Sequence, residues 1–171
     1  MDAQGVGSSR RRAREVALQV LYALDLGRGL SSSGGTVLAP GDNIEAPEPS
    51  GTAPIASEPG SMFEAVAANF EMPEGARDFA RELVERVHEN LAQLDGSISR
   101  HSSNWRIERM AAVDRNILRL GTYELTHTAT PAPVILNEAI DLARRFSNDP
   151  SPAFVNGILD AVARVVRECE P

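Results

Sequence analysis

The stretch FARELVERVHENLAQL, residues Phe79–Leu94, carries the strongest fold signal in this sequence. Its apolar side chains recur every three or four residues and form one stripe: Phe79, Ala80, Leu83, Val84, Val87, Leu91 and Leu94. That spacing places them on one face of an α-helix, while the charged residues between them, such as Arg81 and Glu85, form i,i+4 pairs in solvent. The pattern predicts one uninterrupted helix from about Glu74 to Ser99.

Three more helices are predicted on the C-terminal side of this stripe. A short piece from Trp105 to Arg109 leads into a helix over Met110–Thr126. Thr130-Pro131 and Ser151-Pro152 are start signals for the other two, because proline suits the first helical turn and the preceding hydroxyl can cap free N–H groups.

The N-terminal side begins with a small polar tail, residues 1–9, which we expect to be disordered. A helix over 10–26 follows, with Ser8 or Ser9 as its cap. Residues 27–60 are rich in glycine, proline and serine and lack apolar periodicity. They bury too little surface to offset their ordering entropy, so we expect a disordered insertion, with a partner-docking loop as the alternative.

Structure resumes at Ser61, which has capping-box spacing to Glu64 and begins a short helix that stops before Pro73. No stretch alternates like a strand between turn signals, so the predicted fold class is all-α, with about six or seven helices. We expect an N-terminal subdomain built from residues 10–26 and 61–100 and a C-terminal subdomain over 101–171.

Catalytic chemistry has no candidate residues in this sequence. His88, His101 and His127 lie on different segments, and no HExxH, CxxC, GxSxG, P-loop or GxGxxG motif occurs. The single cysteine, Cys169, favours a reducing cytoplasm, and no window approaches the apolar length of a membrane span. We therefore expect no enzyme, no cofactor, no metal and no membrane partner.

The run Arg10-Arg11-Arg12-Ala13-Arg14 points instead to an anionic ligand, although the net charge is −7. Cations at a predicted helix N-terminus oppose the helix dipole, which indicates an external anion, and free backbone N–H groups there could bind phosphate. Glu15, Gln19 and Tyr22 continue the ridge of Arg12 and add an amide for base edges and a ring for stacking. The alternative is a solubilising charge cluster beside a core tyrosine.

Other basic residues carry weaker signals. Arg144, beside Arg145 at a predicted helix C-terminus, needs no function to explain it. Arg115 and Arg119, at i,i+4 spacing, are either surface residues or a partner contact. We interpret Trp105 as a packing anchor between subdomains rather than as a base-stacking ring.

Three blocks resemble the NusB family of transcription antitermination factors in order and spacing: RRRAREVALQVLYALDL (10–26), NWRIERMAAVDRNILRLGTYEL (104–125) and VILNEAIDLARRFSNDPSPAFVNGILDAV (134–162). The resemblance implies two small helical bundles packed side by side. It also implies binding of the boxA element of nascent ribosomal RNA together with the ribosomal protein NusE, in an antitermination complex on RNA polymerase.

The resemblance also assigns residues. It implies a set that binds single-stranded RNA: Arg10, Arg11, Arg12, Arg14, Gln19, Tyr22 and Arg144. We expect partner contacts at Arg115, Arg119, Phe146 and Phe154, and a role for Asn156 in holding the turn before the last helix.

Two departures from the family pattern affect these expectations. The insertion 27–60 is longer than the usual connection, and Ala153, after Pro150 and Pro152, stands where the family usually has lysine. One cation fewer would flatten the salt dependence of RNA binding by about one unit of slope.

Alternatives remain open beside the antitermination role. The chain could be a protein–protein adaptor that has lost RNA binding, with the insertion as its docking element. A domain that recruits substrate for a ribosomal RNA methyltransferase is disfavoured, because Pro171 ends the chain directly after the last helix. Self-association of some family members, which would cover the RNA face, leaves a homodimer open.

Overall fold

The computed structural model describes residues 3–32, 58–73, 75–103 and 105–169, and over these ranges it contains helices and turns but no strand. The elements are α1 (Ala3–Ser32), α2 (Pro59–Ala67), α3 (Ala76–Glu89), α4 (Leu91–His101), the short 3₁₀ helix η1 (Ile107–Arg109), α5 (Ala112–His127), α6 (Ala132–Phe146) and α7 (Ser151–Cys169). The all-α prediction is confirmed.

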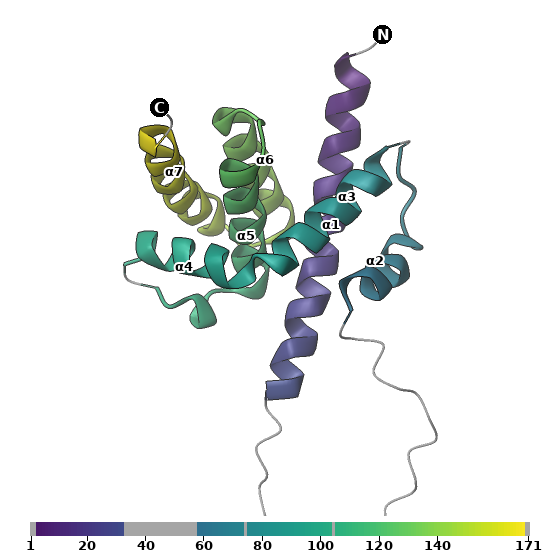
Figure 1. Cartoon of the computed structure of the whole chain (residues 1–171), viewed down its shortest axis with the longest axis horizontal. Coiled ribbons are helices and arrows are strands. Elements are labelled where there is room, and N and C mark those ends of the chain that lie inside the picture. Colours follow the sequence, from purple (N-terminus) through teal and green to yellow (C-terminus); the bar gives the residue numbers. More distant parts are fainter. Residues whose placement is uncertain (1–2, 33–57, 74, 104, 170–171) are drawn as a thin grey trace, which may run out of the picture.

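The helices form two bundles that lie side by side (Figure 1). In the first, the long α1 packs against α2 and α3. In the second, α5 packs against α4, α6 and α7. Contacts of α5 with α1 and α3 join the two bundles.

The division between the bundles falls at Asn90, ahead of the expected boundary at residue 100. The expected single helix over 74–99 is wrong, because Asn90 leaves helical geometry with φ −102° and ψ 12°. The carbonyl of Arg86 accepts both the backbone N–H of Asn90, at 3.2 Å, and its side-chain Nδ2, at 2.7 Å, a local side-chain bond that asparagine readily makes at a helix end. Beyond this break, α4 packs against α5 and α7 and so belongs to the second bundle.

Helix α1 is longer at both ends than the sequence pattern predicted. It begins at Ala3, so a disordered tail over 1–9 is wrong for residues 3–9, and it continues through the first residues of the expected insertion to Ser32. Helix extension from a packed centre is cooperative, and the first proline of the chain is Pro40. Residues 33–57, the remainder of the expected insertion up to Glu58, lie outside the described residues.

The second helix also begins earlier than expected. Its N-cap is Glu58, and Pro59 occupies the first turn, where its fixed φ suits a helix and its missing N–H costs nothing. Ser61 therefore lies inside α2 rather than at its cap. The helix ends at Ala67, well before Pro73.

Helices α1 and α5 pack against more than two other helices each and supply much of the core. The largest fully buried apolar side chains are Phe63, Leu83, Leu94, Ile98, Ile117, Leu118, Leu120, Ile135, Leu159, Val16 and Val20. Gly121 lets α5 approach α7 closely, because a Cβ there would lie 2.7 Å from Cδ1 of Leu159. None of the described helices combines the length and apolarity that a bilayer span requires.

Candidate nucleic-acid interface

The arginine run lies well inside α1 rather than at its N-terminus. The free backbone N–H groups of a helix are those of its first turn, which here begins at Ala3. The expected phosphate site on backbone N–H groups at Arg10–Arg14 is therefore wrong. Any anion that binds this run must be held by its side chains.

Arg10 and Arg12 are placed over aromatic rings of the first bundle. The guanidinium carbon of Arg10 lies 5.7 Å from the centre of the Phe79 ring, and that of Arg12 lies 5.2 Å from the centre of the Phe70 ring. Arg10 is exposed and Arg12 is half-buried. Such cation–π contacts orient a guanidinium while leaving its edge N–H groups for another acceptor.

Arg11 faces the second bundle and pairs with acids of α6. Its Nη2 donates to Glu138 at 2.9 Å and to Asp141 at 3.1 Å. The hydrogen bond to Glu138 and the charge of that carboxylate raise the pKa of Arg11. The Arg11 side chain is still half-exposed, and ion pairs of this kind contribute only about 0–1 kcal/mol. A phosphate can therefore compete for this cation.

Glu15 joins the arginines of α1 to those of α6. This buried carboxylate accepts from Arg12 at 2.9 Å and also pairs with Arg145, whose guanidinium lies over the ring of Phe146. A hollow of about 240 Å³ between α1 and α6 is lined by Arg11, Glu15, Glu138, Asp141, Leu142, Arg144 and Arg145. Arg144 is exposed, and its nearest acid, Asp141, lies 3.6 Å away.

Arg14 points into the protein, and the prediction that it contacts RNA needs correction. Its side chain donates to both carboxylate oxygens of Glu124 on α5, at 2.8 and 2.6 Å. Arg14 is only 3% exposed and Glu124 only 1%. Burial by itself lowers the pKa of Arg14, but the hydrogen bond and charge of Glu124 outweigh it and the net pKa is raised. Arg14 therefore joins the two bundles through a buried salt bridge.

The rest of the predicted ridge on α1 is only partly exposed. Tyr22 is 38% exposed, so its ring is available for stacking, and Gln19 is half-buried. Glu15 is buried and bonded to Arg12, so the four positions do not form one open strip. Tyr22 is thus a surface residue rather than the core tyrosine of the alternative interpretation.

Arg115 and Arg119, the expected partner contacts on α5, bond within the chain instead. Asp25 of α1 accepts from Arg115 at 2.6 Å and pairs with Arg119 at 3.2 Å. Arg119 is buried and also makes two bonds to Asp95 of α4, at 2.7 and 2.8 Å. These residues tie α1, α4 and α5 together, so a partner contact at Arg119 is not supported.

The aromatic residues near the α6–α7 turn behave differently from one another. Phe146 and Phe154 are half-buried and pack against the core. Trp105 is 58% exposed and makes a T-shaped contact with Phe154, with ring centres 6.1 Å apart. The interpretation of Trp105 as a packing anchor between subdomains is wrong, because most of its surface is exposed.

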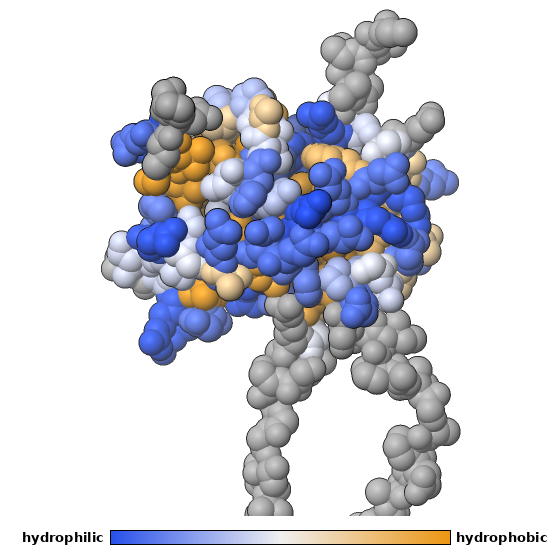
Figure 2. Space-filling model, in the orientation of Figure 1, coloured by the Kyte–Doolittle hydropathy of each residue, from blue (hydrophilic) through white to orange (hydrophobic). Residues whose placement is uncertain are grey.

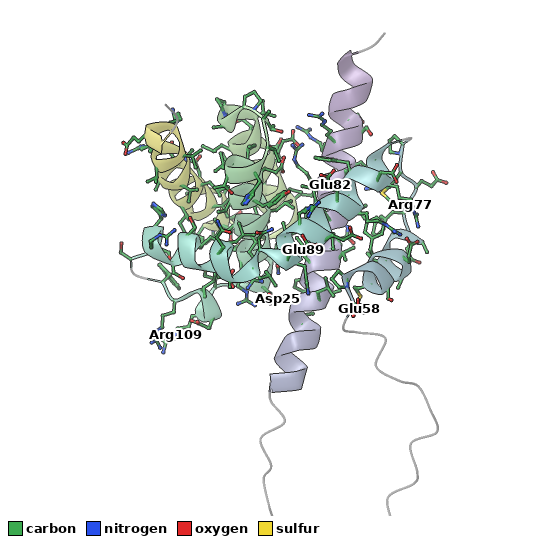
Figure 3. All side chains as sticks on the ribbon, in the orientation of Figure 1. Asp25, Glu58, Arg77, Glu82, Glu89 and Arg109 are labelled. Atoms are coloured by element: carbon green, nitrogen blue, oxygen red, sulfur yellow. The ribbon has the colours of Figure 1, made fainter. Side chains whose placement is uncertain are left out.

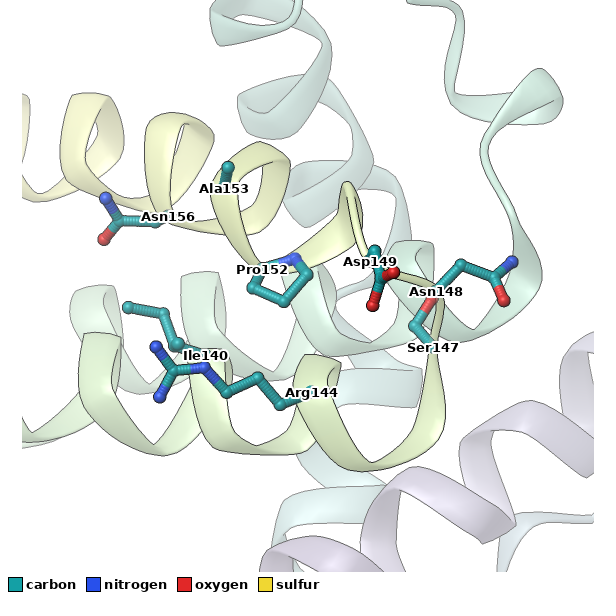
Figure 4. A pocket seen from close by; sticks show the side chains of 8 residues that line it. All are labelled: Ile140, Arg144, Ser147, Asn148, Asp149, Pro152, Ala153 and Asn156. Atoms are coloured by element: carbon teal, nitrogen blue, oxygen red, sulfur yellow. The ribbon is translucent and has the colours of Figure 1, made fainter.

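The turn between α6 and α7 is held by residues that the sequence did not indicate. The carboxylate of Asp114 accepts from the hydroxyls of Ser147 at 2.6 Å and Ser151 at 2.8 Å. Asn156, expected to hold this turn, is exposed on α7 instead. It lines a hollow of about 500 Å³ with Arg144 across from it on α6 (Figure 4).

The acids and the additional arginine of the α1–α6 hollow were also missed. Glu138, Asp141 and Arg145 follow at i,i+3,i+7 spacing, so the sequence could have shown that they share a face of α6. It could not show that this face lies against α1. Over the described parts of the chain, no three His, Cys, Asp or Glu side chains gather closely enough to hold a metal ion.

Comparisons with known proteins agree with this arrangement. The model of the NusB family matches residues 51–164. A transcription antitermination protein NusB of Solibacter usitatus is 42% identical and the match covers 94% of this chain and 92% of that protein. The NusB protein of Myxococcus xanthus is 40% identical, with 91% and 94% covered.

Solved structures show the same likeness. T. maritima NusB superposes with a TM-score of 0.69 at 29% identity, and the match covers 91% of this chain and 90% of that one. A structure of the antitermination factors NusB and NusE in complex with double-stranded RNA gives a TM-score of 0.68 at 27% identity, with 92% and 98% covered.

Proposed function

The chain belongs to the NusB family, and from this membership we propose that it is a transcription antitermination factor that binds RNA together with a NusE-type ribosomal protein. The RNA would be the boxA element of nascent ribosomal RNA, and the assembly would join RNA polymerase in the cytoplasm. The role is one of binding, with no catalytic step assigned to any residue.

The observation that carries RNA binding is the meeting of two arginine groups from distant parts of the sequence. Helix α6 brings Arg144 and Arg145 to the hollow that Arg11 lines on α1. We propose contacts with RNA by Arg10, Arg11, Arg12, Gln19, Tyr22, Arg144 and Arg145. Arginine suits this role, because its planar fork can bind phosphate through two N–H groups and can stack on bases.

Charge argues that this binding needs a partner. The chain carries a net charge of −7, so surfaces away from the arginine face repel RNA. Hydrophilic residues cover much of the middle of the face in Figure 2, where α3 runs, and the acids Glu82 and Glu89 lie on that helix (Figure 3). A partner that extends the basic surface would raise affinity without changing the residues that contact the RNA.

The test is fluorescence anisotropy with a boxA-type RNA and a scrambled RNA, with and without the NusE-type partner, over a salt series. We expect tighter binding to the boxA-type RNA and a further increase with the partner. Changing Arg10, Arg11 and Arg12 together to glutamine should weaken binding and lower the salt slope by about two units, since each phosphate contact on a single strand contributes about 0.7.

The matched control changes three arginines elsewhere, Arg86, Arg164 and Arg167, which are exposed on α3 and α7. It alters net charge equally and should leave the preference for boxA-type RNA unchanged. Equal and weak binding of both RNAs by the wild-type protein would contradict the proposal and favour the adaptor role.

A further inference from the structure

Three hollows follow one another along the surface from α1 to η1. The first is the α1–α6 hollow of Arg11 and Arg145, and it shares Arg144 with the second, at the α6–α7 turn. The second shares Asn148 with a third, of about 310 Å³, which Trp105, Arg109 and Phe154 line. We call this third hollow, with Trp105, Arg109 and Phe154, the tryptophan shelf. Each hollow thus shares a lining residue with the next, and we call the three together the track.

Trp105 is the most exposed of the large hydrophobic side chains that the structure describes, at 58%. Its ring makes a T-shaped contact with Phe154, with an interplanar angle of 70°. Because more than half of its surface is exposed, the indole can take another flat ring. Every nucleobase offers such a ring, which makes aromatic shelves a common feature of single-strand binding surfaces.

The backbone that carries Trp105 is firmly held although the ring is exposed. The N–H of Trp105 donates to the carbonyl of Ser102 at 2.8 Å, and its own carbonyl accepts from the Ser102 hydroxyl at 3.0 Å. Farther along, Arg115 donates to the carbonyls of Ile107 and Met110, at 3.1 and 3.3 Å. The shelf is thus preorganised, which lowers the entropy cost of binding.

The opposite side of the shelf is fixed to the same helix. Asp114, in the first turn of α5, holds Ser147 and Ser151 of the α6–α7 turn through their hydroxyls. Both sides of the shelf are therefore attached to the N-terminal part of α5. A ligand meets a rigid surface there.

Exposed arginines, rather than net charge, are the features of this track that can bind an anionic strand. The lining holds the arginines Arg11, Arg144, Arg145 and Arg109 together with the acids Glu15, Glu138, Asp141, Asp149 and Asp114. Arg109 is exposed, forms no ion pair within the described residues, and projects outward from η1 (Figure 3). Arg144 lies between the first two hollows and Arg109 at the far end. Asp149 lines the middle hollow, so phosphates favour Arg144 on one side of it and Arg109 in the hollow beyond it.

We propose that the RNA strand bound by the arginines of α1 continues along this track and stacks a base on Trp105, with Arg109 contacting a phosphate. This inference rests on the proposed RNA binding and adds the tryptophan shelf to it. The occupant is single-stranded RNA, because only an unpaired base can leave its neighbours to stack on a side chain.

The chain contains a single tryptophan, so its fluorescence, excited at a wavelength that the two tyrosines do not absorb, reports on this position alone. The experiment titrates the full-length protein with a short boxA-type RNA and with the same RNA lengthened at either end. We expect only a lengthened RNA to quench the fluorescence of Trp105. In anisotropy, Trp105→Ala should weaken binding of that RNA about tenfold, as one lost stacking contact does, and leave the short RNA unaffected.

Companion variants separate stacking from a change in the fold. Trp105→Phe should restore most of the affinity, and Arg109→Gln should lower the salt slope by about 0.7 unit. The control is Val165→Ala on α7, an exposed apolar residue that lines none of the three hollows, which should change nothing. Thermal melting of each variant verifies that it is folded.

The outcomes distinguish the shelf from the proposed function. RNA binding that depends on Arg10–Arg12 but shows no quenching and no effect of Trp105→Ala would overturn the shelf and leave the function standing. Absence of RNA binding by the wild-type protein, with and without partner, would overturn both. Quenching by the partner protein alone would show that a protein occupies the shelf and would also overturn the inference.

Discussion

The outer and inner faces of α1 carry the same side chain in opposite settings. On the outer face, Arg11 is half-exposed and shares its N–H groups with two acids that solvent also reaches. On the inner face, Arg14 gives a two-pronged hydrogen bond to a buried carboxylate of α5. Arg11, which is accessible to a ligand, and Arg14, which joins the two bundles, are only three positions apart in the sequence. Exposure, rather than residue type, decides the role of each arginine.

The largest expected effect comes from breaking the inner pair. Arg14→Ala leaves Glu124 buried without a partner, and losses of about 3–5 kcal/mol are typical for such a change. We expect urea unfolding, followed by circular dichroism, to show a loss of this size. The matched control, Arg164→Ala in the exposed pair with Asp160, should leave the unfolding midpoint unchanged.

A compensated variant keeps this prediction testable if Arg14→Ala does not fold. Changing Arg14 to methionine and Glu124 to leucine removes both charges, so most of the stability should return. The same variant should bind RNA like the wild-type protein, because Arg14 does not face the ligand. Loss of RNA binding in this folded variant would contradict the conclusion that Arg14 stabilises the fold and does not contact RNA.

A smaller effect is expected at the second inner cluster, Asp25 with Arg115 and Arg119. Asp25→Asn weakens the charged hydrogen bonds that Asp25 accepts and should cost about 2 kcal/mol at neutral pH. Asp160→Asn on the surface of α7 is the control and should change stability little. An equal loss in both variants would contradict a special role for the cluster.

The pH dependence of this cluster has a definite sign. Burial by itself raises the pKa of Asp25, but the hydrogen bond from Arg115 and the charges of Arg119 and Arg115 outweigh it, so the net pKa lies below the ordinary value. The stabilisation is then complete above the pKa of an unfolded aspartate, about 3.9, and is lost as pH falls through the lower folded value. The difference between wild type and Asp25→Asn should therefore shrink below about pH 4.

The smallest stability effect is expected on the outer face. Arg11→Gln removes a half-exposed pair and should change the free energy of unfolding by less than about 1 kcal/mol, after screening by solvent. The same change should weaken RNA binding and lower the salt slope by about 0.7 unit. A large loss of stability without a change in RNA binding would place Arg11 with the inner residues.

The sequence does contain a signal for the buried position of Arg14. Arg14 precedes Ala17 by three residues and Leu21 by seven, so it lies on the apolar stripe of α1. Glu124 lies four and seven residues after Leu120 and Ile117 on α5, again on an apolar stripe. Opposite charges on the apolar faces of two helices predict a buried pair.

Other features had no such signal. The break at Asn90 interrupts an apolar stripe that continues on both sides of it, so periodicity alone could not find it. The exposure of Trp105 depends on how η1 is held by Ser102 and Arg115. A large apolar ring is usually buried in a folded protein. Only these contacts to the backbone place the ring of Trp105 on the surface.

The sequence by itself determined the all-helical class, the apolar face of each helix and the arginine-rich segment, because these follow from the periodicity of neighbouring residues. Only the tertiary structure decided which arginines face solvent. Arg14 and Glu124 are 110 positions apart, and Arg11 and Asp141 are 130 apart. Such pairs are set by how whole helices pack, and the strength of each depends on the burial that packing creates.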